Sequence, residues 1–452
     1  MRSGRRNTEL GLLVLVVIIT AGAYVLASLG QDAAIPVNIG PFLLVLLALL
    51  LSGNLVTRRF APDADPMLLP LAGLLNGLGY VMIARLNESL AGYQALWTAA
   101  GFLAFLVTLV VIKRIRDLAR YRYTFMLLGV VLLALPLVPV IGQDINGSQI
   151  WVRFGPVNFQ PGEFAKIVLA VFFAGYLVDK RELLATPTRR FGPVLLPEPK
   201  YFGPLLLAWG VSLLVMISQK DLGSSLLFFA LFIVMLWVAT ERGAYLAAGI
   251  ALFAGGAYAA WRVFSHVQDR VAIWIDPFKD PYGKGFQIVQ AAFAMAAGGV
   301  AGSGLGLSGK IRSFPAKETD FIFAFIAQEL GLLGATVVLL AFLLIVGAGF
   351  RIAVRSENTF EKLLATGLTF LIGFQAFIIL AGVTRLLPLT GVTLPFVSYG
   401  GSSLVANYVL VALLLRISDE TNRPGTKATK APKAAKAPKA AKAPKATTAA
   451  SS

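Results

Sequence analysis

A single aspartate, Asp320, stands where a polar stretch of the sequence ends and a long apolar stretch begins. The residues around it read FPAKETDFIFAFIAQELG, over 314–331. A carboxylate at such a boundary can take a proton from a substrate hydroxyl, as a general base does. It can equally start a helix as its N-cap, where the positive end of the helix dipole favours a negative charge. The residue types alone leave both interpretations of Asp320 open.

The second carboxylate of this stretch is Glu329, nine residues further on. At ~1.5 Å rise and about 3.6 residues per turn, this spacing places Glu329 on the opposite helix face and ~13 Å along the axis. The two carboxylates therefore do not form an acid–base pair on one helix. Asp320 is the candidate catalytic residue by itself.

Two further segments carry ionisable residues at the start of apolar runs. In FQPGEFAKIVLA, Pro161 suits the first position of a helix, and Glu163 and Lys166 are three residues apart and share one face. Charged residues inside a membrane segment usually face a polar cavity or each other, so a substrate site and a structural ion pair are both open. In SQKDLGSS, Asp221 either caps the next helix or contacts a substrate.

A glycine-rich segment, GLGLSGK at 304–310, comes close to the nucleotide-binding P-loop pattern. Ile311 stands where that pattern needs Ser or Thr for magnesium, and no strand precedes the segment. The P-loop interpretation is therefore rejected. What is left is a turn whose backbone N–H groups, with Lys310 and Arg312, could hold an anionic phosphate group, or glycines that serve only the turn itself.

Composition places the chain among polytopic membrane proteins. Of its 452 residues, 57% are hydrophobic and only 14% are charged. No cysteine is present and His266 is the single histidine, which excludes thiol nucleophiles, thiolate zinc sites and histidine triads. Proton transfer must fall to Asp, Glu, Lys or Tyr. No cluster of three or more carboxylates points to a metal site, and no nucleic-acid partner is expected.

Twelve apolar runs are long enough to span a bilayer, which predicts an all-α fold. The first follows the basic opening MRSGRR, and because it is about as long as a span and no clear A-x-A cleavage site follows, we interpret it as uncleaved. The runs cover 10–30, 39–57, 67–86, 93–112, 123–142, 161–179, 203–218, 222–239, 244–263, 321–349, 361–386 and 398–416.

Basic residues set the predicted orientation of these spans. Of the 40 Lys and Arg residues, 28 fall in the two termini and in alternate loops, which the positive-inside rule assigns to the cytoplasm. The segments 143–160, 218–221 and 264–320 then lie on the outer side, and Asp320 faces outward. The connection 264–320 is the longest, and long loops are usually functional.

The chain divides into a transmembrane part, residues 1–416, and a tail, residues 417–452. The tail ends in a Lys/Ala/Pro repeat, which cannot bury enough apolar surface to order itself and is expected to be disordered. Its lysines could attract anionic membrane lipids, or the tail is only a solubilising extension.

Four segments together resemble the SEDS family of bacterial cell-wall polymerases, which includes RodA, FtsW and SpoVE. They read DPFKDPYGKGFQIVQA, GGVAGSGLGLSGK, FPAKETDFIFAFIAQELG and PLTGVTLPFVSYGGSSL, and the resemblance covers 143–416 in the family's order. It implies a peptidoglycan glycosyltransferase of the bacterial plasma membrane that polymerises lipid II into glycan strands. It also implies a class B penicillin-binding transpeptidase as partner, with other elongation or division machinery.

The resemblance also implies roles for residues. The essential aspartate of the family's T-D-F-I-F-A motif corresponds to Asp320. The family's Q-P-S-E-x-x-K corresponds to Gln160, Pro161, Glu163 and Lys166, and its Q-P-D-L-G to Gln219, Asp221 and Gly223. The departures are Ile150 before Trp151, where the family often has Arg and Arg153 is the nearest base, Gly162 for Ser, Lys220 for Pro and Ile379 for a common Asn. With two spans beyond the family's usual ten, within 1–142, they favour an actinobacterial elongation-type member over a divisional one.

The predicted reaction uses Asp320 as general base on the acceptor's 4-hydroxyl, while Arg270, Lys310 and Arg312 hold the donor's diphosphate. The remaining predicted substrate-binding residues are Glu163, Lys166, Arg153, Asp221, Ser398 and Ser402. No cofactor is certain, and a requirement for a divalent cation, Mg or Mn, is left open. Two alternatives remain: a lipid II flippase whose passage Glu163, Lys166 and Glu329 would line, and a non-catalytic scaffold for the transpeptidase.

Overall fold

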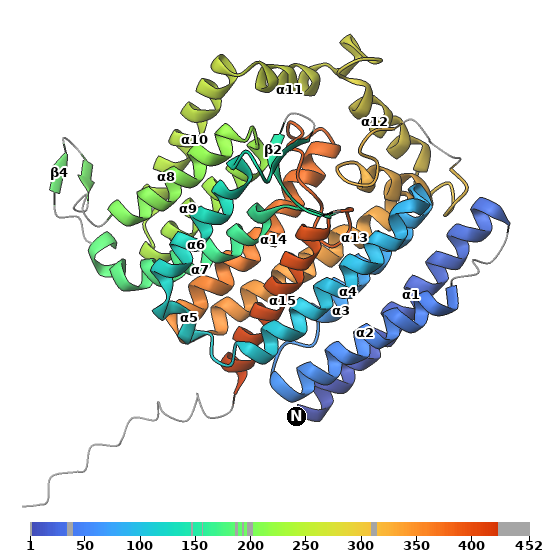
Figure 1. Cartoon of the computed structure of the whole chain (residues 1–452), viewed down its shortest axis with the longest axis horizontal. Helices are drawn as coiled ribbons and strands as arrows, with labels where there is room; N and C mark the ends of the chain where they lie inside the picture. The colour runs from blue at the N-terminus through green and yellow to red at the C-terminus, as the bar shows by residue number, and fades with distance from the viewer. Residues whose placement is uncertain are drawn as a thin grey trace, which may run out of the picture.

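The computed structural model describes residues 2–33, 39–145, 148–155, 157–185, 189–191, 194–196, 202–308 and 314–423. Each of the twelve apolar runs overlaps a helix, which confirms the predicted all-α polytopic fold (Figure 1). The run 123–142 is too long, because its α-helix ends at Ala134 and a strand begins at Gly142. The twelve helices are α1 (Arg2–Asp32), α2 (Ile39–Phe60), α3 (Leu68–Leu86), α4 (Glu88–Val111), α6 (Arg122–Ala134), α7 (Pro161–Ala185), α8 (Gly203–Ser218), α9 (Leu222–Thr240), α10 (Gly243–Val263), α13 (Ile322–Arg355), α14 (Thr359–Val383) and α15 (Gly401–Asn422).

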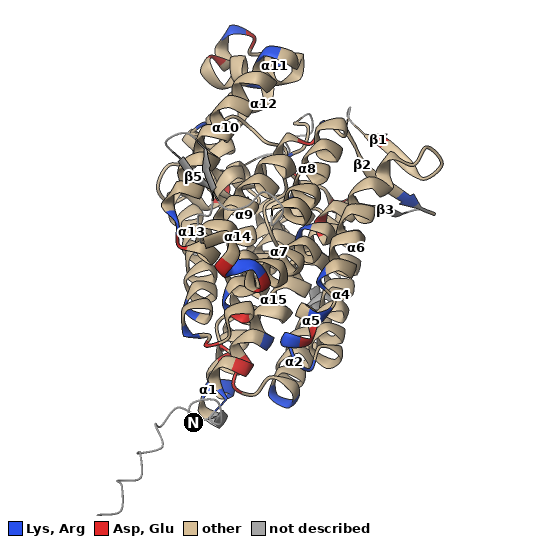
Figure 2. Ribbon diagram, turned by 90° about the vertical axis from the view of Figure 1, so that its left-hand side faces the viewer, with Lys and Arg blue, Asp and Glu red and all other residues tan. Residues whose placement is uncertain are grey.

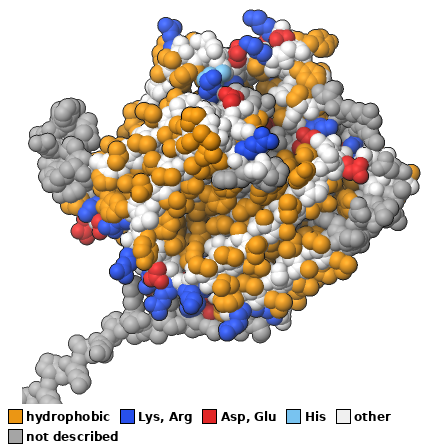
Figure 3. Space-filling model, in the orientation of Figure 1, with side chains coloured by type: hydrophobic (Ala, Val, Ile, Leu, Met, Phe, Trp, Pro, Cys, Tyr) orange, Lys and Arg blue, Asp and Glu red, His pale blue; other side chains and the backbone are white. Residues whose placement is uncertain are grey.

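Nine helices within the described residues are long and apolar enough to cross a membrane. The segment Arg122–Leu137 and α8 are shorter apolar helices, and α2 has 22 residues. In Figure 2, Lys, Arg, Asp and Glu residues lie in the lower part of the ribbon and on α11 at its upper end, with a further group midway. Figure 3 shows a broad hydrophobic surface with charged side chains mostly at its margins. Helices satisfy their own backbone hydrogen bonds, so such a bundle can sit in lipid. The chain is a multi-pass membrane protein.

The core of the bundle is formed by α7, α9, α13, α14 and α15, with α3 and α4 packed beside it. These helices bury large side chains at their contacts; Phe102 on α4 packs against Tyr408 on α15, and Phe173 on α7 packs against Phe232 on α9. The N-terminal pair, α1 and α2, packs on α3 and α4 at the edge of the bundle (Figure 1). The pair thus adds to a core that the later helices build.

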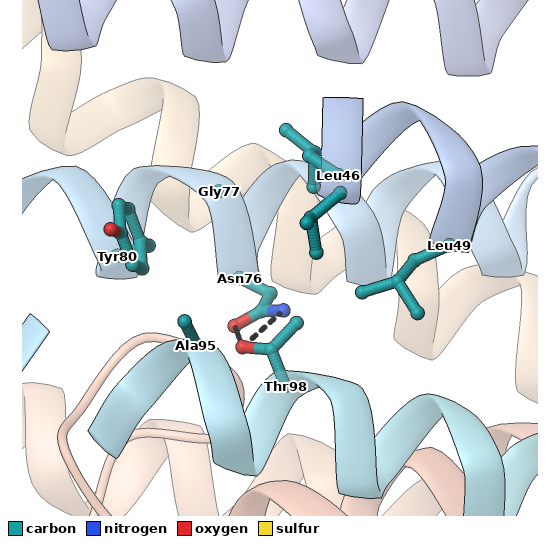
Figure 4. A pocket seen from close by; sticks show the side chains of 8 residues that line it. Leu46, Leu49, Asn76, Gly77, Tyr80, Ala95 and Thr98 are labelled. Atoms are coloured by element: carbon teal, nitrogen blue, oxygen red, sulfur yellow. Dashed lines mark hydrogen bonds between the residues drawn. The ribbon is translucent and has the colours of Figure 1, made fainter. Parts of the chain in front are cut away.

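A small pocket lies between α2, α3 and α4 (Figure 4). Leu46 and Leu49 of α2 form an apolar wall, and the Asn76 amide and the Thr98 hydroxyl hydrogen-bond to each other on the other side. Asn76 also donates to the Tyr408 hydroxyl at 2.9 Å. The polar groups at this position are thus used to join α3, α4 and α15, and none of the predicted site residues lines the pocket.

The end of the bundle that holds the start of α1 also holds the end of α15. The backbone N–H of Asp63, in the α2–α3 connection, donates to the Asp419 carboxylate at 2.8 Å, and Arg423 donates to the same carboxylate at 2.7 Å. These bonds keep α15 helical to Asn422, so the predicted start of the tail at 417 is wrong. The remainder of the tail that was expected to be disordered, residues 424–452, lies outside the described residues.

The opposite end carries structure that the hydropathy pattern did not predict. Three short strands, β1 (Gly142–Ile145), β2 (Ser148–Phe154) and β3 (Val157–Phe159), form an antiparallel sheet. The segment 264–320, expected as a long loop, contains α11 (Ser265–Ile275), the 3₁₀ turn η3 (Pro277–Lys279) and α12 (Phe286–Gly298). These helices have 11 and 13 residues, too short to span, so a search for spans does not detect them.

The other short elements lie at the connections between spans. They are α5 (Arg116–Arg120), η1 (Leu135–Leu137) and the hairpin of β4 (Arg189–Phe191) and β5 (Val194–Leu196).

Candidate functional site

Asp320 lies just outside α13, in the turn that precedes it. The helix begins at Ile322, Phe321 occupies the N-cap position, and no side chain caps the helix. The Asp320 side chain is half-buried. The interpretation of Asp320 as the helix N-cap is therefore wrong, and its carboxylate is available for another role.

The turn that carries Asp320 is held by contacts from distant parts of the chain. The Ser398 hydroxyl donates to the Thr319 carbonyl oxygen at 2.6 Å, and the Tyr399 N–H donates to the Glu318 carbonyl oxygen at 2.8 Å. The Asn87 amide, at the end of α3, donates to the Glu318 carboxylate at 3.0 Å. Two distant parts of the chain, the segment 398–399 and the end of α3, thus hold the turn on which Asp320 stands.

Arg270 on α11 is the cation that faces Asp320. A Cβ atom added to Gly391 would lie 3.6 Å from Arg270 Nη2 and 3.8 Å from Asp320 Oδ2, so the guanidinium and the carboxylate approach the same point. Gly391 has φ +74°, a backbone conformation that favours glycine. Arg270 Nη1 donates to the Leu389 carbonyl oxygen at 2.8 Å, which directs the guanidinium toward this point.

The surroundings change the ionisation of both groups. Burial raises the pKa of the Asp320 carboxyl to about 6, although a hydrogen bond from Thr319 and the charge of Arg270 act in the opposite direction. Burial lowers the pKa of Arg270, while the negative charges of Asp320 and Asp221 raise it. A carboxylate with this pKa is ionised near neutral pH and is a stronger base than an exposed aspartate.

Asp221 stands at the start of α9 and caps it, as one of the two interpretations predicted. Its carboxylate accepts from the Ser224 N–H at 2.9 Å. Burial raises the pKa of Asp221, and hydrogen bonds from Ser224 act against this. Asp221 also lines a pocket with Gln160 and Gln219, and its charge acts on Arg270. Asp221 therefore caps α9 and also contributes a negative charge near Arg270.

Glu163 and Lys166 form a buried ion pair on α7, with Lys166 Nζ 2.8 Å from Glu163 Oε1. Lys166 also donates to the Gln375 amide oxygen of α14 at 2.9 Å, and Gln375 donates to the Thr393 carbonyl oxygen at 2.9 Å. The Thr393 hydroxyl donates to the Ser403 hydroxyl at 3.0 Å. This polar chain fixes the segment 392–394, which follows Gly391, and so gives the pair a role in positioning the site.

The two predicted serines are buried and bonded to backbone. Ser398 accepts from the Leu394 N–H at 2.9 Å in addition to its bond to Thr319. The Ser402 hydroxyl accepts from the Gln160 N–H at 2.9 Å. Both geometries suit loop positioning. Arg153 lies exposed on β2 and donates to the Gly155 carbonyl oxygen at 3.2 Å. Lys310 and Arg312 lie outside the described residues.

Three backbone N–H groups in the described part of the glycine-rich segment are used inside the protein. Gly304 N–H donates to the Glu329 carbonyl oxygen and Gly306 N–H donates to the Glu329 carboxylate, both at 3.0 Å. The N–H of Leu307 donates to the Gly304 carbonyl oxygen at 3.2 Å. These three amides are therefore not available to a phosphate, and the rest of the predicted site, Lys310 and Arg312, lies outside the described residues.

Glu329 does not join Glu163 and Lys166 in one passage. It contacts Arg85 and the glycine-rich segment, whereas Glu163 and Lys166 line a pocket with residues of α14 and α15. The arrangement predicted for a flippase is thus not present in the described residues. Within those residues no group of three or more Asp, Glu or His side chains could hold a metal ion.

Several positioning residues were missed from the sequence: Gly391, Thr319, Gln375, Thr393, Ser403 and Arg85. Two of them carried a signal, because Gln375 and Arg85 are polar residues within apolar runs. Gly391, Thr393 and Ser403 lie inside the stretch PLTGVTLPFVSYGGSSL, of which only Ser398 and Ser402 were predicted site residues.

Comparisons with known proteins identify the family of this chain. A family model described as a cell cycle protein, FtsW/RodA/SpoVE, matches residues 69–423. Peptidoglycan glycosyltransferase RodA of Mycobacterium tuberculosis (strain ATCC 25618 / H37Rv) is 44% identical over 431 residues, covering 93% of this chain and 92% of that protein. Stage V sporulation protein E of Bacillus subtilis (strain 168) is 33% identical, covering 80% and 99%.

A solved structure shows the same fold. It was reported for the coordination of polymerization and crosslinking by a peptidoglycan synthase complex, and one of its chains is 26% identical with a TM-score of 0.64, covering 80% of this chain and 99% of that one. The family match begins after α1 and α2, and it includes the ion pair of α7, Arg270 and Asp320. The chain belongs to the FtsW/RodA/SpoVE family.

Proposed function

We propose that this protein is a peptidoglycan glycosyltransferase that polymerises lipid II during cell elongation, with Asp320 as its general base. The observation that carries the role of Asp320 is its position: a half-buried carboxylate outside the helix, with a raised pKa and a guanidinium facing it across Gly391. A carboxylate that does not cap a helix, with a cation facing it, suits a reaction that removes a proton and releases an anion.

The reaction balances with these groups alone. The acceptor's 4-hydroxyl oxygen attacks the anomeric carbon of the donor sugar and its proton passes to Asp320. The bond from that carbon to the diphosphate oxygen breaks, and the diphosphate leaves with the electron pair. Arg270 stabilises the charge that develops on it. A single displacement inverts an α-linked donor to a β-glycosidic bond.

The sidedness follows from the basic residues. Since the loops at the N-terminal end of the bundle are rich in Lys and Arg, the positive-inside rule assigns that end and both termini to the cytoplasm. The end with α11 and Asp320 then faces the outer side of the plasma membrane, where the nascent strand is built.

A class B penicillin-binding transpeptidase is the proposed partner, and the likeness to a chain from a synthase complex supports this. Adding such a single-span partner to the purified chain should raise the polymerisation rate. Equal rates with and without each candidate transpeptidase would count against the proposal. The other elongation or division machinery remains an expectation from the family.

A requirement for Mg or Mn is a separate question. The described residues do not show a cluster suited to such an ion, so no step is assigned to it. Strand synthesis measured with a chelator, and then with Mg or Mn added back, tests the requirement.

The decisive experiment is reconstitution of the purified chain with lipid II, with no other polymerase present. We expect glycan strands, separated by length on a gel, from the wild type and almost none from Asp320→Asn. Head-group translocation without strands would favour a flippase instead. Absence of both activities, with the partner transpeptidase added, would favour a scaffold.

A further inference from the structure

The glycine-rich loop, defined here as residues 299–308, is held between two helices. On one side the loop packs against the kink of α13, where Gly331 has φ +65°. Ser303 N–H donates to the Gln328 carbonyl oxygen at 2.9 Å, and Leu332 N–H donates to the Gly299 carbonyl oxygen at 3.0 Å. The loop therefore replaces hydrogen bonds that the kink removes from α13.

A buried charge pair fixes the far end of this loop. Glu329, 1% exposed, accepts from the Ser308 hydroxyl at 2.5 Å, and its carboxylate lies 3.2 Å from Arg85 Nε. Arg85 Nη2 also lies 3.3 Å from the Ser308 hydroxyl. Since a buried charge is costly without its partner, this arrangement holds Gly306 and Ser308 in one place.

The end of α1 closes the other side of the loop by direct backbone contact. A Cβ atom added to Gly30 would overlap the carbonyl oxygen of Leu305. One added to Gly306 would overlap the carbonyl oxygen of Ala27 and lie 3.0 Å from the Gln31 nitrogen. Two glycines thus permit helix and loop to touch, and the helix that does so precedes the residues that the family model matches.

The end of α3, which carries Arg85, also contacts the turn of Asp320. Arg85 pairs with Glu329, and two residues later Asn87 donates to the Glu318 carboxylate at 3.0 Å. Phe314, which begins the described residues after the loop, packs against Phe321 and Phe325 with ring centroids 5.3 and 5.2 Å away. The end of α3 thus supports both the glycine-rich loop and the turn 314–321.

We propose that α1 is a positioning element for the catalytic turn: its end presses the glycine-rich loop against the Arg85–Glu329 pair, which in turn sets the turn of Asp320. None of these groups touches the reacting atoms in this mechanism, so they are positioning residues. The inference rests on the proposed function and extends it, since it assigns a task to a helix outside the family match.

A matched pair of glycine substitutions in one helix tests the inference. Gly30→Ala adds a methyl group against Leu305, whereas Gly22→Ala, in the same helix, adds one where no atom lies within 4 Å. Both changes replace a glycine of α1 by a better helix former, and only the change at Gly30 meets another part of the chain. Strand synthesis from lipid II is measured against substrate concentration, together with lipid II binding and the midpoint of thermal unfolding.

We expect Gly30→Ala to lower kcat about ten-fold, because a shift of ~1 Å at a catalytic group has effects of this size or larger. Apparent KM, lipid II binding and the unfolding midpoint should stay within error of Gly22→Ala. A Gly30→Ala enzyme with the kcat of Gly22→Ala would overturn the inference, and so would a kcat loss that merely follows a fall in the unfolding midpoint. An inactive wild type would instead refute the proposed function.

The second arm addresses the charge pair. Ser308→Ala removes one hydrogen bond to Glu329 and keeps both charges, and Thr336→Ala removes a hydroxyl that donates to Leu332 within α13. The inference requires a lower kcat for Ser308→Ala and wild-type kcat for Thr336→Ala at equal unfolding midpoints. Equal kcat values for the two variants would contradict it. The added value of this arm is that it does not alter α1.

Discussion

At the residue scale, the proposed role of Asp320 depends on its ability to accept a proton. Asn has nearly the size and the helix-capping ability of Asp but cannot accept a proton at neutral pH. Since the carboxylate does not cap α13, Asp320→Asn should fold, bind lipid II and lose about 10²–10⁴-fold in rate. Strand synthesis and lipid II binding, measured in parallel, check this. More than a tenth of the wild-type rate would require another base, with Glu163 and Asp221 the next candidates.

The raised pKa of Asp320 predicts a pH dependence. Burial moves the pKa of this carboxyl to about 6, so the ionised, active form is lost as the pH falls through 6. We expect kcat/KM to be half-maximal near pH 6, about two units above the value for an exposed aspartate. A rate that stays constant down to pH 5 would contradict the assignment of the base.

The raised pKa of Asp320 also predicts how the free energy of unfolding changes with pH. A carboxyl whose folded pKa is raised stabilises the folded state only while protonated, and this contribution is lost as the pH rises through the folded value of about 6. At pH 7.5, Asp320→Asn should therefore unfold at the same or a higher temperature than the wild type. The stabilities of the two should converge as the pH falls toward 4.

At the scale of elements, the end of α15 illustrates what anchors a span. Asp419 is fully buried and accepts from the Asp63 N–H and from Arg423. Asp419→Ala should lower the free energy of unfolding by about 3–5 kcal/mol, because the buried Arg416 loses a partner. Truncation after Arg423 removes only the repeat-rich tail and should leave stability and strand synthesis unchanged. Thermal unfolding of both variants in the same detergent checks the contrast.

For the whole molecule, the prediction concerns orientation in the membrane. The chain contains no cysteine, so a single introduced thiol reports one position. Tyr282, 92% exposed beyond α11, should become accessible from outside intact cells as Tyr282→Cys. Arg114→Cys, exposed at the other end of the bundle, should react only after the membrane is opened. Labelling of Arg114→Cys in intact cells would reverse the proposed orientation.

The spans, the first turn of α7 and the cap at Asp221 were determined by the sequence alone. Hydropathy locates helices because backbone groups in lipid must bond within the helix, and short-range spacing places Glu163 and Lys166 on one face. The Glu163–Lys166 pair and the Asp221–Ser224 bond are local, within three residues, so spacing was sufficient to predict them.

Only the tertiary structure showed which residues far apart in the chain meet at the site. Asp320 meets Arg270 across Gly391, and Glu329 is taken up by Arg85 and the glycine-rich loop, over separations along the chain that no periodicity encodes. The short helices α11 and α12 were not predicted, because 11 and 13 residues are too few to cross a bilayer and hydropathy reveals only spans. The residue type of Asp320 allowed a cap or a base, and only the observed start of α13 at Ile322 removed the first, because a cap must meet the first free N–H groups of its helix.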